Sequence, residues 1–342
     1  DNLIPIHSSG VFMNALIIGG TGTISADVVT CAAARGWDIT LLNRGQRSKT
    51  MPPGTRLIEC DARDEGAMKQ ALAGMYFDVV ANFIGFLPEQ IEQDIRIFDG
   101  ACAQYIFVST CCVYQKPDGH YLTTESTPLR NLNSLYGRRK IACEETLNHA
   151  YREKNFPITI VRPNWTYCLG TIPFVFTSWR RPWTLVDRLE KGLPIIIPGD
   201  GQNRFTITHA ADFARGFVGL MGNYHALGHA IHITGEEALT WNQYLEQIER
   251  IVGKKAAVVH AATDTIVKLL PHLHDDLAGD KTVNFLFDTT KLRRFVPDFA
   301  AGISYYEGVK ASVDYLRAHP ELQNIDTEYL ANYDKVLAAC GL

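Results

Sequence analysis

The pentapeptide Tyr136-Gly137-Arg138-Arg139-Lys140 places a phenol and an ammonium group four residues apart on a predicted helix, residues 135–154. Positions i and i+4 of a helix lie on one face, about one turn apart, so both groups can address the same small volume. A phenol, whose ordinary pKa is near 10, is a useful base at pH 7 only when a nearby positive charge lowers that pKa, and Lys140 can supply this charge. The pair alone is also typical of a solvated helix surface. It becomes a candidate hydride-transfer site through its combination with a glycine-rich turn earlier in the chain.

That glycine-rich turn runs from Gly19 to Ser25, after a predicted strand and at the start of a predicted helix. This is the context that a dinucleotide-binding turn requires. Gly19 and Gly22 permit a tight turn and close approach of a pyrophosphate to the helix start, where the N–H groups of residues such as Thr23 and Ile24 favour an anion. Ser25 stands where a third glycine is expected, and a residue this small still lets the helix pack on the sheet.

The end of the second predicted strand indicates which dinucleotide is bound. NAD-specific folds place an acidic residue there to contact the ribose, whereas this chain has Asn43, Arg44 and Gly45, followed by Arg47 and Lys49. A carboxylate would repel a 2′-phosphate, but a guanidinium can bind one. The sequence therefore favours NADP over NAD, with Arg44 and Asn43 as the residues that recognise the 2′-phosphate.

Short apolar runs alternate with amphipathic stretches in the first half of the chain, which is typical of a parallel sheet with crossover helices. The predicted fold class is therefore α/β, a Rossmann-type doubly wound parallel sheet with a smaller C-terminal substrate-binding lobe. Strands are predicted at residues 15–18, 38–42, 56–60, 78–82, 105–109 and 158–161. Helices are predicted at residues 23–35, 64–73, 88–103, 135–154, 210–221 and 240–252.

The pattern changes after Val161 to a loop rich in Pro and Trp, and loops of this length usually form binding surfaces. We therefore predict a NAD(P)-binding domain over residues 13–163 and, over residues 164–342, mainly a substrate-binding lobe interleaved with that domain. Met13 directly precedes the first strand. The segment 1–12 is therefore expected to be an appended remnant ahead of the natural start.

Composition excludes several other classes of protein. The chain has 342 residues, 46% of them apolar, and its 33 Lys and Arg against 37 Asp and Glu give a net charge of −4, so it has no global basic field for a polyanion. No apolar run approaches the ~20 residues that span a bilayer. Eight cysteines include no C-x-x-C pair, which favours free thiols in a reducing cytoplasm. We expect a cytoplasmic protein.

These residues, taken in order, resemble the extended short-chain dehydrogenase/reductase family and, within it, the NAD-dependent epimerase/dehydratase group. The resemblance covers nearly the whole chain from Met13 to about Tyr315. Some segments look closest to a subgroup that includes the chloroplast stem-loop-binding proteins and many sugar-nucleotide epimerase homologues. The motifs that carry the resemblance are the turn at 19–25, Asp61, the run 107–114, Tyr136 with Lys140, Arg162-Pro163 and the run 204–212, with the subgroup indicated by residues 43–45, 240–241 and 287–292.

The resemblance implies roles for further residues. Asp61 is expected to contact the adenine, with Ala62, Phe83 and Ile84 also at the cofactor. Thr110 is expected to be the hydroxyl partner of Tyr136. The same resemblance places Pro163 near the nicotinamide amide, and it places Asn164 or Trp165, together with Arg204, near a substrate diphosphate.

Two departures limit what can be carried over. Dehydratases of this family carry Asp-Glu directly after the active-site Thr, for proton removal and loss of water, whereas here Cys111 and Cys112 occupy those places. Dehydration is therefore not expected, and the two thiols are interpreted as small apolar filling. Cys168 stands where a glycine is usual, so the course of that loop is not predicted.

In the leading hypothesis Tyr136, as a phenolate, takes a proton from a substrate hydroxyl while hydride passes to the nicotinamide, with Thr110 orienting the oxygen. Return of the hydride to the other face of the ketone gives epimerisation, and exchange of the cofactor gives a simple oxidoreductase. The family's abundant members act on sugar nucleotides, which favours a nucleotide-sugar 4-epimerase, with an NADPH-dependent ketone or keto-sugar reductase as the alternative. RNA binding of the stem-loop-binding kind is the alternative from another class, and the negative net charge argues against it.

Two histidine clusters invite a metal hypothesis, but no metal site is predicted. His225, His229 and His232 are spaced as on a helix, yet Gly228 and a predicted strand interrupt them. The second cluster is residues 272–276, which contains two histidines and two aspartates. Family resemblance further implies a homodimer packed through the helices around residues 88–103 and 135–154.

Overall fold

The structure is a computed structural model that describes residues 13–45, 51–117 and 119–342. The predicted remnant at 1–12 and the basic residues Arg47 and Lys49 lie outside the described residues.

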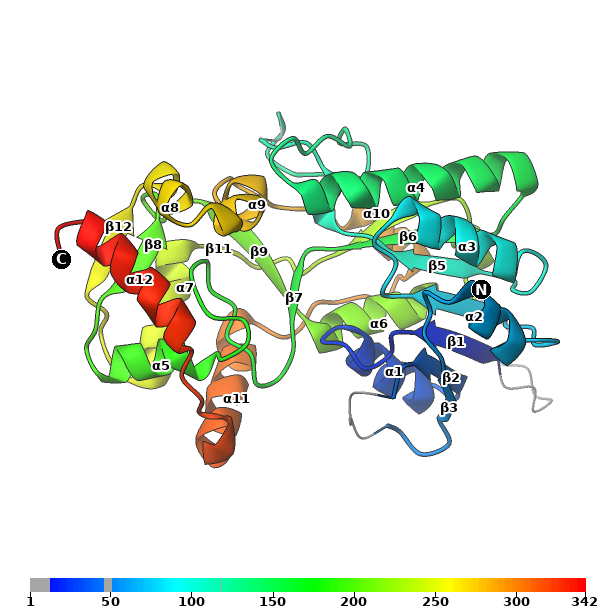
Figure 1. The fold of residues 1–342 in the computed structure, drawn as a ribbon, viewed down its shortest axis with the longest axis horizontal. Coiled ribbons are helices and arrows are strands. Elements are labelled where there is room, and N and C mark those ends of the chain that lie inside the picture. The colour runs from blue at the N-terminus through cyan, green and yellow to red at the C-terminus, as the bar shows by residue number, and fades with distance from the viewer. Residues whose placement is uncertain (1–12, 46–50, 118) are drawn as a thin grey trace.

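A seven-stranded sheet in the order β10-β6-β5-β4-β1-β2-β3 forms the larger part of the molecule (Figure 1). Every neighbouring pair in this sheet is parallel. The carboxyl ends of the strands therefore meet along one edge, where ligands of such sheets bind. The strands are β1 (Asn14–Ile18), β2 (Asp38–Asn43), β3 (Arg56–Glu59), β4 (Val79–Asn82), β5 (Tyr105–Val108), β6 (Ile158–Pro163) and β10 (Ala230–Ile233).

Helices cover both faces of this sheet, which confirms the predicted doubly wound class. One face packs against α1 (Ser25–Ala34) and α6 (Ala210–Leu220), and the other packs against α2 (Glu65–Ala71), α3 (Pro88–Phe98) and α4 (Leu135–Lys154). Apart from the edge strand β3, which is largely exposed, the strands are buried on both sides, because they contribute apolar residues to the two cores.

The six predicted strands and the helices around them are present, with shifts at their ends. The largest shift is in α3, which was predicted to reach Ala103 but ends at Phe98. Asp99 leaves the helical conformation with a ψ of 117°, and Gly100 then has a φ of 71°. A positive φ suits glycine and stops the helix there.

The remaining elements build a smaller lobe around its own aromatic core (Figure 1). Its strands form a three-stranded sheet in the order β11-β9-β7 and a pair, β12-β8. These are β7 (Trp165–Tyr167), β8 (Ile195–Pro198), β9 (Arg204–His209), β11 (Ala238–Thr240) and β12 (Val258–Ala261). The later helices are α5 (Trp183–Glu190), α7 (Trp241–Val252), α8 (Thr263–Leu269), α9 (His274–Asp276), α10 (Thr290–Phe295), α11 (Tyr305–Ala318) and α12 (Thr327–Ala339).

The two parts are interleaved along the chain. Strand β10 joins the large sheet beside β6, and α6 packs against α1, although both elements follow β7 in sequence. In the other direction, the short 3-10 helix η1 (Cys111–Val113) leaves the end of β5 and buries its side chains in the core of the smaller lobe. Across the described residues, no helix has the length and apolar character that crossing a membrane requires.

Candidate active site

A cleft of about 440 Å³ runs along the carboxyl edge of the large sheet. Its lining includes every residue that the sequence assigned to the cofactor. These are Gly19, Gly22, Thr23, Ile24, Asn43, Arg44, Asp61, Ala62, Phe83, Ile84, Tyr136, Lys140 and Pro163.

The glycine-rich turn forms one wall of the cleft. Gly19 has a φ of 84°, and a Cβ there would overlap the side chain of Ile84, so the position requires glycine on both counts. Ser25 is buried and ties the turn together: its hydroxyl donates to the Gly19 carbonyl at 2.7 Å and accepts from the Gly22 N–H at 2.8 Å. A hydroxyl therefore replaces the third glycine by closing the turn itself.

The cleft suits a dinucleotide. Helix α1 begins without a side-chain cap, so its N-terminal N–H groups and dipole can face an anion such as a pyrophosphate. Ser109, in the cleft lining, has a buried hydroxyl without a hydrogen-bond partner. A buried polar atom without a partner is costly unless a ligand or water satisfies it. The uncapped helix, the glycine that admits no Cβ and this hydroxyl fit an NAD(P) molecule.

Tyr136 and Lys140 lie in the first and second turns of α4. Lys140 is buried, and its Nζ donates to the carbonyls of Gly85 at 2.6 Å and Val108 at 2.7 Å. An ammonium has three donors, so one remains for the cleft that it lines. The side-chain amide oxygen of Asn82 accepts from the N–H groups of Ile84 and Gly85, which holds the turn that receives the lysine.

The sequence predicts that Lys140 lowers the pKa of the Tyr136 phenol. For the protein without a bound dinucleotide, this prediction is wrong. The Lys140 Nζ lies 6.0 Å from the centre of the Tyr136 ring. Burial around the hydroxyl is the largest influence and raises the pKa of Tyr136, while a hydrogen bond with Thr110 lowers it. The phenol therefore stays protonated at pH 7. Burial also lowers the pKa of Lys140, from 10.5 to about 8.

Thr110 does not line the cleft, but it directly follows Val108 and Ser109, which do. It follows β5, is buried, and shares a hydrogen bond with the Tyr136 phenol. Its hydroxyl also accepts from the Cys112 N–H at 3.1 Å, which starts η1. The structure thus brings Thr110, Tyr136 and Lys140 together, as the sequence predicted for a hydride-transfer site.

The two cysteines after Thr110 are placed as filling and not as acids or nucleophiles. Cys111 is fully buried in the core of the smaller lobe, and its thiol donates to the Arg162 carbonyl at 3.3 Å. Burial raises the pKa of Cys111 and raises that of Cys112 to about 12. Neither thiol ionises near neutral pH. No disulfide joins cysteines in the part of the chain that is described.

The three residues assigned to a substrate diphosphate do not line the cleft. The side chain of Asn164 donates to the Thr206 carbonyl at 2.6 Å. Trp165 is buried against Trp179, with ring centres 4.6 Å apart. Arg204 is exposed at the start of β9.

The histidine clusters are dispersed over different elements. His232 is buried in β10, where its Nε2 lies 2.6 Å from the Asp288 carbonyl, and burial lowers its pKa. His225 lies in a separate 3-10 turn. Asp275, from the second cluster, contacts the start of α4. Among the described residues, no three His, Cys, Asp or Glu side chains are grouped as metal ligands.

Sequence reasoning gave no role in the cleft to several of its lining residues, and two of them are informative. Arg63 follows β3 and lines the cleft together with Arg44. Its N–H donates to the Asp61 carboxylate at 3.0 Å, and its position two residues after an expected adenine contact was the available signal. Ser109 was recognised only as part of a family motif. Its unpartnered hydroxyl is visible only in three dimensions.

The doubly wound sheet, the uncapped helix behind a glycine turn, and the Thr110–Tyr136–Lys140 group define an enzyme of the extended short-chain dehydrogenase/reductase type. The sequence model of the NAD dependent epimerase/dehydratase family matches residues 15–234. The chain belongs to the NAD-dependent epimerase/dehydratase family. Members of this family include epimerases, dehydratases and reductases.

Three known proteins illustrate the range of its relatives. The chain is 24% identical to 2′-dehydrokanamycin reductase of Streptomyces kanamyceticus over 289 residues, 84% of this chain and 80% of the reductase. It is 26% identical over 241 residues to a chloroplast stem-loop binding protein of 41 kDa from Arabidopsis thaliana, covering 66% of this chain and 60% of the relative. UDP-glucuronic acid 4-epimerase of Bacillus cereus, solved with NAD, shares the fold with a TM-score of 0.70, 18% identity, and coverage of 91% of this chain and all of the epimerase chain.

Proposed function

We propose that this protein is an NADP-dependent reductase that transfers hydride to a ketone on a sugar. The observation that carries the proposal is a pair of arginines, Arg44 and Arg63, in the lining of the dinucleotide cleft. They follow β2 and β3, the two strands at one edge of the sheet, whereas Tyr136 lies on the α4 side. The arginines are therefore at the adenosine end of the cleft.

A 2′-phosphate suits this end of the cleft better than a bare ribose does. Two guanidinium groups can both pair with a phosphate, and charge-assisted contacts of this kind are the strong ones. Asn43, where a ribose-binding carboxylate would stand, uses its side-chain oxygen to accept from the Gly45 N–H at 2.8 Å. Among the described residues, Asp61 is the one carboxylate in the cleft lining.

The protonated phenol suits reduction. When bound, a reduced nicotinamide supplies the hydride. The Tyr136 hydroxyl can donate its proton to the carbonyl oxygen, because a phenol is already neutral at pH 7 and burial raises the pKa of this one further. Thr110, which is hydrogen-bonded to the phenol, orients that oxygen.

The contacts of the residues predicted to bind a substrate diphosphate favour a keto sugar over a nucleotide sugar as the substrate. Asn164 and Trp165 are engaged in contacts of the smaller lobe and do not line the cleft. The relative aligned over 84% of this chain is, by its name, a reductase of 2′-dehydrokanamycin. We therefore place ketone reduction ahead of 4-epimerisation. A nucleotide-sugar 4-epimerase is the second candidate, and the shared fold of the Bacillus cereus epimerase favours it.

The cofactor proposal is tested by calorimetric titration of NADPH and NADH into the wild-type protein, Arg44→Ala and Arg63→Ala. We expect NADPH to bind more tightly, with each substitution weakening NADPH by about tenfold or more and leaving NADH nearly unchanged, since a charged hydrogen bond contributes roughly 1.5–3 kcal/mol. Arg56→Ala is the matched control. Arg56 lies on the edge strand β3, which Arg63 follows, but it pairs with Asp38 and is not part of the cleft lining. Tighter binding of NADH would refute the NADP assignment.

The reaction itself is tested with a panel of keto sugars and UDP-sugars. A reductase consumes reduced nicotinamide in proportion to the ketone added. An epimerase instead interconverts two UDP-sugars, seen by chromatography, with no net change in nicotinamide absorbance. Interconversion of UDP-sugars without net cofactor consumption would establish the second candidate in place of the first.

A further inference from the structure

The helix that carries Tyr136 has its N-terminus capped by a residue from a distant part of the chain. The carboxylate of Asp275 accepts from the Leu135 N–H at 2.7 Å and from the Tyr136 N–H at 3.2 Å. It also accepts from the Ser134 hydroxyl at 2.5 Å. The same hydroxyl accepts from the Gly137 N–H at 2.9 Å.

These contacts satisfy N–H groups that a helix leaves unpaired at its start. The groups in the first turn have no partner within the helix, and they need side chains or water. Ser134 serves one of them, that of Gly137, and Asp275 serves the two before it. A carboxylate at this end also interacts favourably with the helix dipole. Asp275 is therefore a second cap, added to the ordinary N-cap residue.

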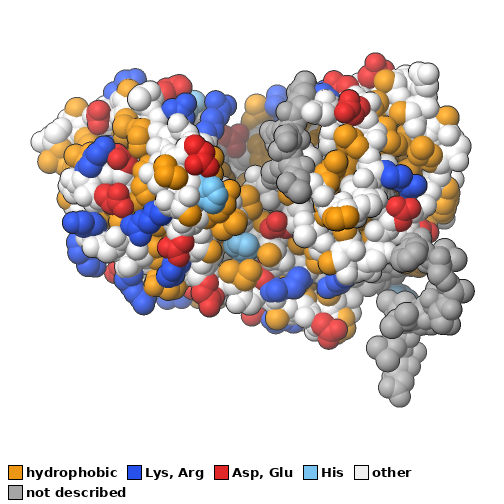
Figure 2. Space-filling model, turned by 90° about the horizontal axis from the view of Figure 1, so that it is seen from below, with side chains coloured by type: hydrophobic (Ala, Val, Ile, Leu, Met, Phe, Trp, Pro, Cys, Tyr) orange, Lys and Arg blue, Asp and Glu red, His pale blue; other side chains and the backbone are white. Residues whose placement is uncertain are grey.

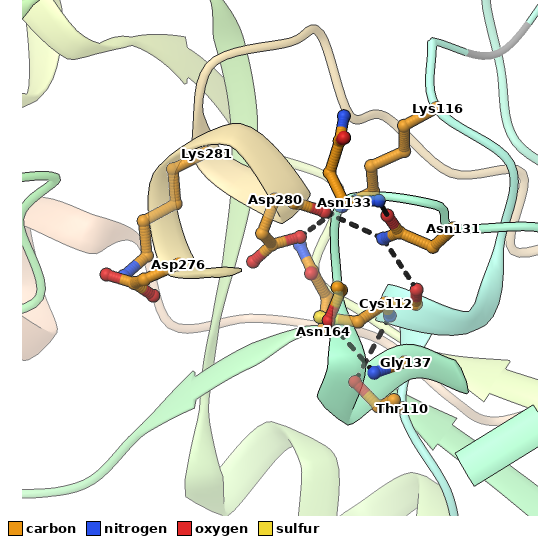
Figure 3. A network of polar contacts seen from close by, with 12 residues as sticks. Thr110, Cys112, Lys116, Asn131, Asn133, Gly137, Asn164, Asp276, Asp280 and Lys281 are labelled. Carbon is orange, nitrogen blue, oxygen red and sulfur yellow. Dashed lines mark hydrogen bonds and ion pairs between the residues drawn. The ribbon is translucent and has the colours of Figure 1, made fainter. Parts of the chain in front are cut away.

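Asp275 belongs to the segment 274–281. This segment makes two further contacts near the turn after Thr110, with Asn131 and with Lys116 (Figure 3). The side chain of Asn131 donates both to the Cys112 carbonyl at 2.8 Å and to the Gly279 carbonyl at 2.7 Å. Asp280 forms a buried ion pair with Lys116. The turn after Thr110 and the start of α4 are thus both joined to one segment of the smaller lobe.

The packing leaves this segment little freedom to shift. A Cβ on Gly279 would lie 3.0 Å from the Asn133 carbonyl oxygen and 3.0 Å from the Ser134 Cβ. A Cβ on Gly137 would come within 2.5 Å of the Cys112 carbonyl oxygen. Both glycines therefore permit backbone contacts that fix the distance between the segment, the helix start and the turn after Thr110.

We propose that Asp275 is a positioning residue for the reaction, holding the first turn of α4 so that the Tyr136 phenol stays aligned with Thr110. This inference rests on the proposed role of Tyr136. Asp275 acts on the tyrosine through the backbone N–H and is not itself part of the cleft lining. The second turn has its own anchors, since Lys140 is held by the carbonyls of Gly85 and Val108.

This difference between the turns gives the proposal a specific signature. Loss of Asp275 frees the Leu135 and Tyr136 N–H groups and loosens the first turn, so the phenol moves while the ammonium does not. Turnover depends on the phenol, and dinucleotide binding depends more on the ammonium. The variant should therefore lose kcat and retain dinucleotide affinity.

The test compares Asp275→Ala and Asp275→Asn with a matched control, Asp326→Ala. Asp326 is the N-cap residue of α12 and also accepts from one backbone N–H and one serine hydroxyl, those of Tyr329 at 3.0 Å and Ser178 at 2.5 Å. For each protein the dinucleotide Kd, the melting temperature and kcat with an accepted substrate are measured. The NMR signal of the Tyr136 ring carbon is also followed in ¹³C-tyrosine-labelled protein, assigned by its loss in Tyr136→Phe.

We expect Asp275→Ala to shift the Tyr136 signal and to lower kcat on the order of 10- to 100-fold, because small misplacement of a catalytic group is costly. Its dinucleotide Kd should stay within about twofold, and Asp275→Asn, which keeps an acceptor oxygen, should recover most of the turnover. Asp326→Ala should lower the melting temperature without shifting the Tyr136 signal.

The positioning role is overturned if the Tyr136 signal does not shift in Asp275→Ala, or if Asp326→Ala loses as much kcat as Asp275→Ala does. Failure of the proposed function gives a different result: Tyr136→Phe then keeps wild-type turnover, while the NMR comparison still decides whether Asp275 holds the tyrosine.

Discussion

At the scale of single residues, the site holds the Tyr136 phenol and the Lys140 ammonium in different ways. Tyr136 shares a hydrogen bond with Thr110, and burial keeps its phenol neutral. Lys140 is held by two backbone carbonyls, and burial lowers its pKa to about 8. The two groups therefore respond differently to substitution and to pH.

Tyr136→Phe is expected to lower turnover by a factor on the order of 10²–10⁴, the usual contribution of a positioned acid–base group, and to leave folding and dinucleotide binding intact. Thr110→Val should be intermediate, because it removes the orienting hydroxyl but not the proton donor. Single-turnover hydride transfer, followed by nicotinamide absorbance, measures both. Tyr151→Phe, further along α4, serves as the control. Wild-type rates in Tyr136→Phe would rule out the mechanism.

Dinucleotide affinity is expected to fall as the pH rises through about 8, because Lys140 then loses its proton. The effect of this group on stability has the opposite sign. Between about 8 and 10.5 the unfolded chain still holds the proton that the folded chain has released, so the free energy of unfolding rises with pH. Fluorescence titration of the dinucleotide on both sides of pH 8 measures the first effect. Lys140→Met should bind more weakly and lose this pH dependence, and a retained dependence would assign it to another group.

At the scale of elements, α4 is also fixed to the sheet in the turn that follows Tyr136 and Lys140. Arg162 on β6 makes two hydrogen bonds to Glu144, at 3.0 Å from its Nε and 2.5 Å from its Nη2, and it also donates to the Tyr114 hydroxyl at 3.1 Å. The ion pair is buried on both sides. Because Glu144 lies one turn after Lys140, this pair sets how the catalytic helix lies over β5 and β6.

Glu144→Ala is expected to lower the free energy of unfolding by about 3–5 kcal/mol, because it leaves the Arg162 charge buried without its partner. Replacing both residues by apolar ones of similar size, Glu144→Leu with Arg162→Met, should cost much less. Urea denaturation measures the difference. Asp314→Ala, which breaks the exposed pair with Lys310, is the control and should cause no resolvable change. Equal stability of Glu144→Ala and the wild type would show that the pair does not hold the helix.

At the scale of the whole molecule, charge is distributed without a dominant basic surface. Lys and Arg side chains are interspersed with Asp and Glu over the face in Figure 2. The net charge of the chain is −4. Nucleic-acid binding depends on many phosphate contacts from basic side chains, and this face does not gather them.

We therefore expect no specific RNA binding at physiological salt, in spite of the likeness to a chloroplast stem-loop binding protein. A gel-shift series with a structured RNA stem-loop over increasing salt measures this. Retention below about 1 μM that weakens steeply with salt, as counterion release requires, would contradict the expectation and favour the RNA-binding alternative.

Much of this fold follows from local pattern. Runs such as residues 15–18 and 158–161 are apolar throughout and separated by amphipathic stretches, which is sufficient to predict parallel strands with crossover helices. The cofactor cleft was predictable for a related reason. Apart from Tyr136 and Lys140 on α4, the predicted cofactor residues sit at the carboxyl ends of consecutive strands or in the turns that follow them, and these positions meet at one edge of any parallel sheet.

The sequence by itself therefore determined the α/β class, the glycine turn and the Tyr136–Lys140 pair, because each depends on residues that are neighbours along the chain or share a sheet edge. Only the tertiary structure decided the electrostatics and the supports of the site. The raised pKa of Tyr136 arises from burial by segments far apart in sequence. The cap from Asp275 joins groups about 140 residues apart, with separations of 139 and 140 in the chain. No local pattern encodes such a contact, because it depends on how the smaller lobe packs against α4.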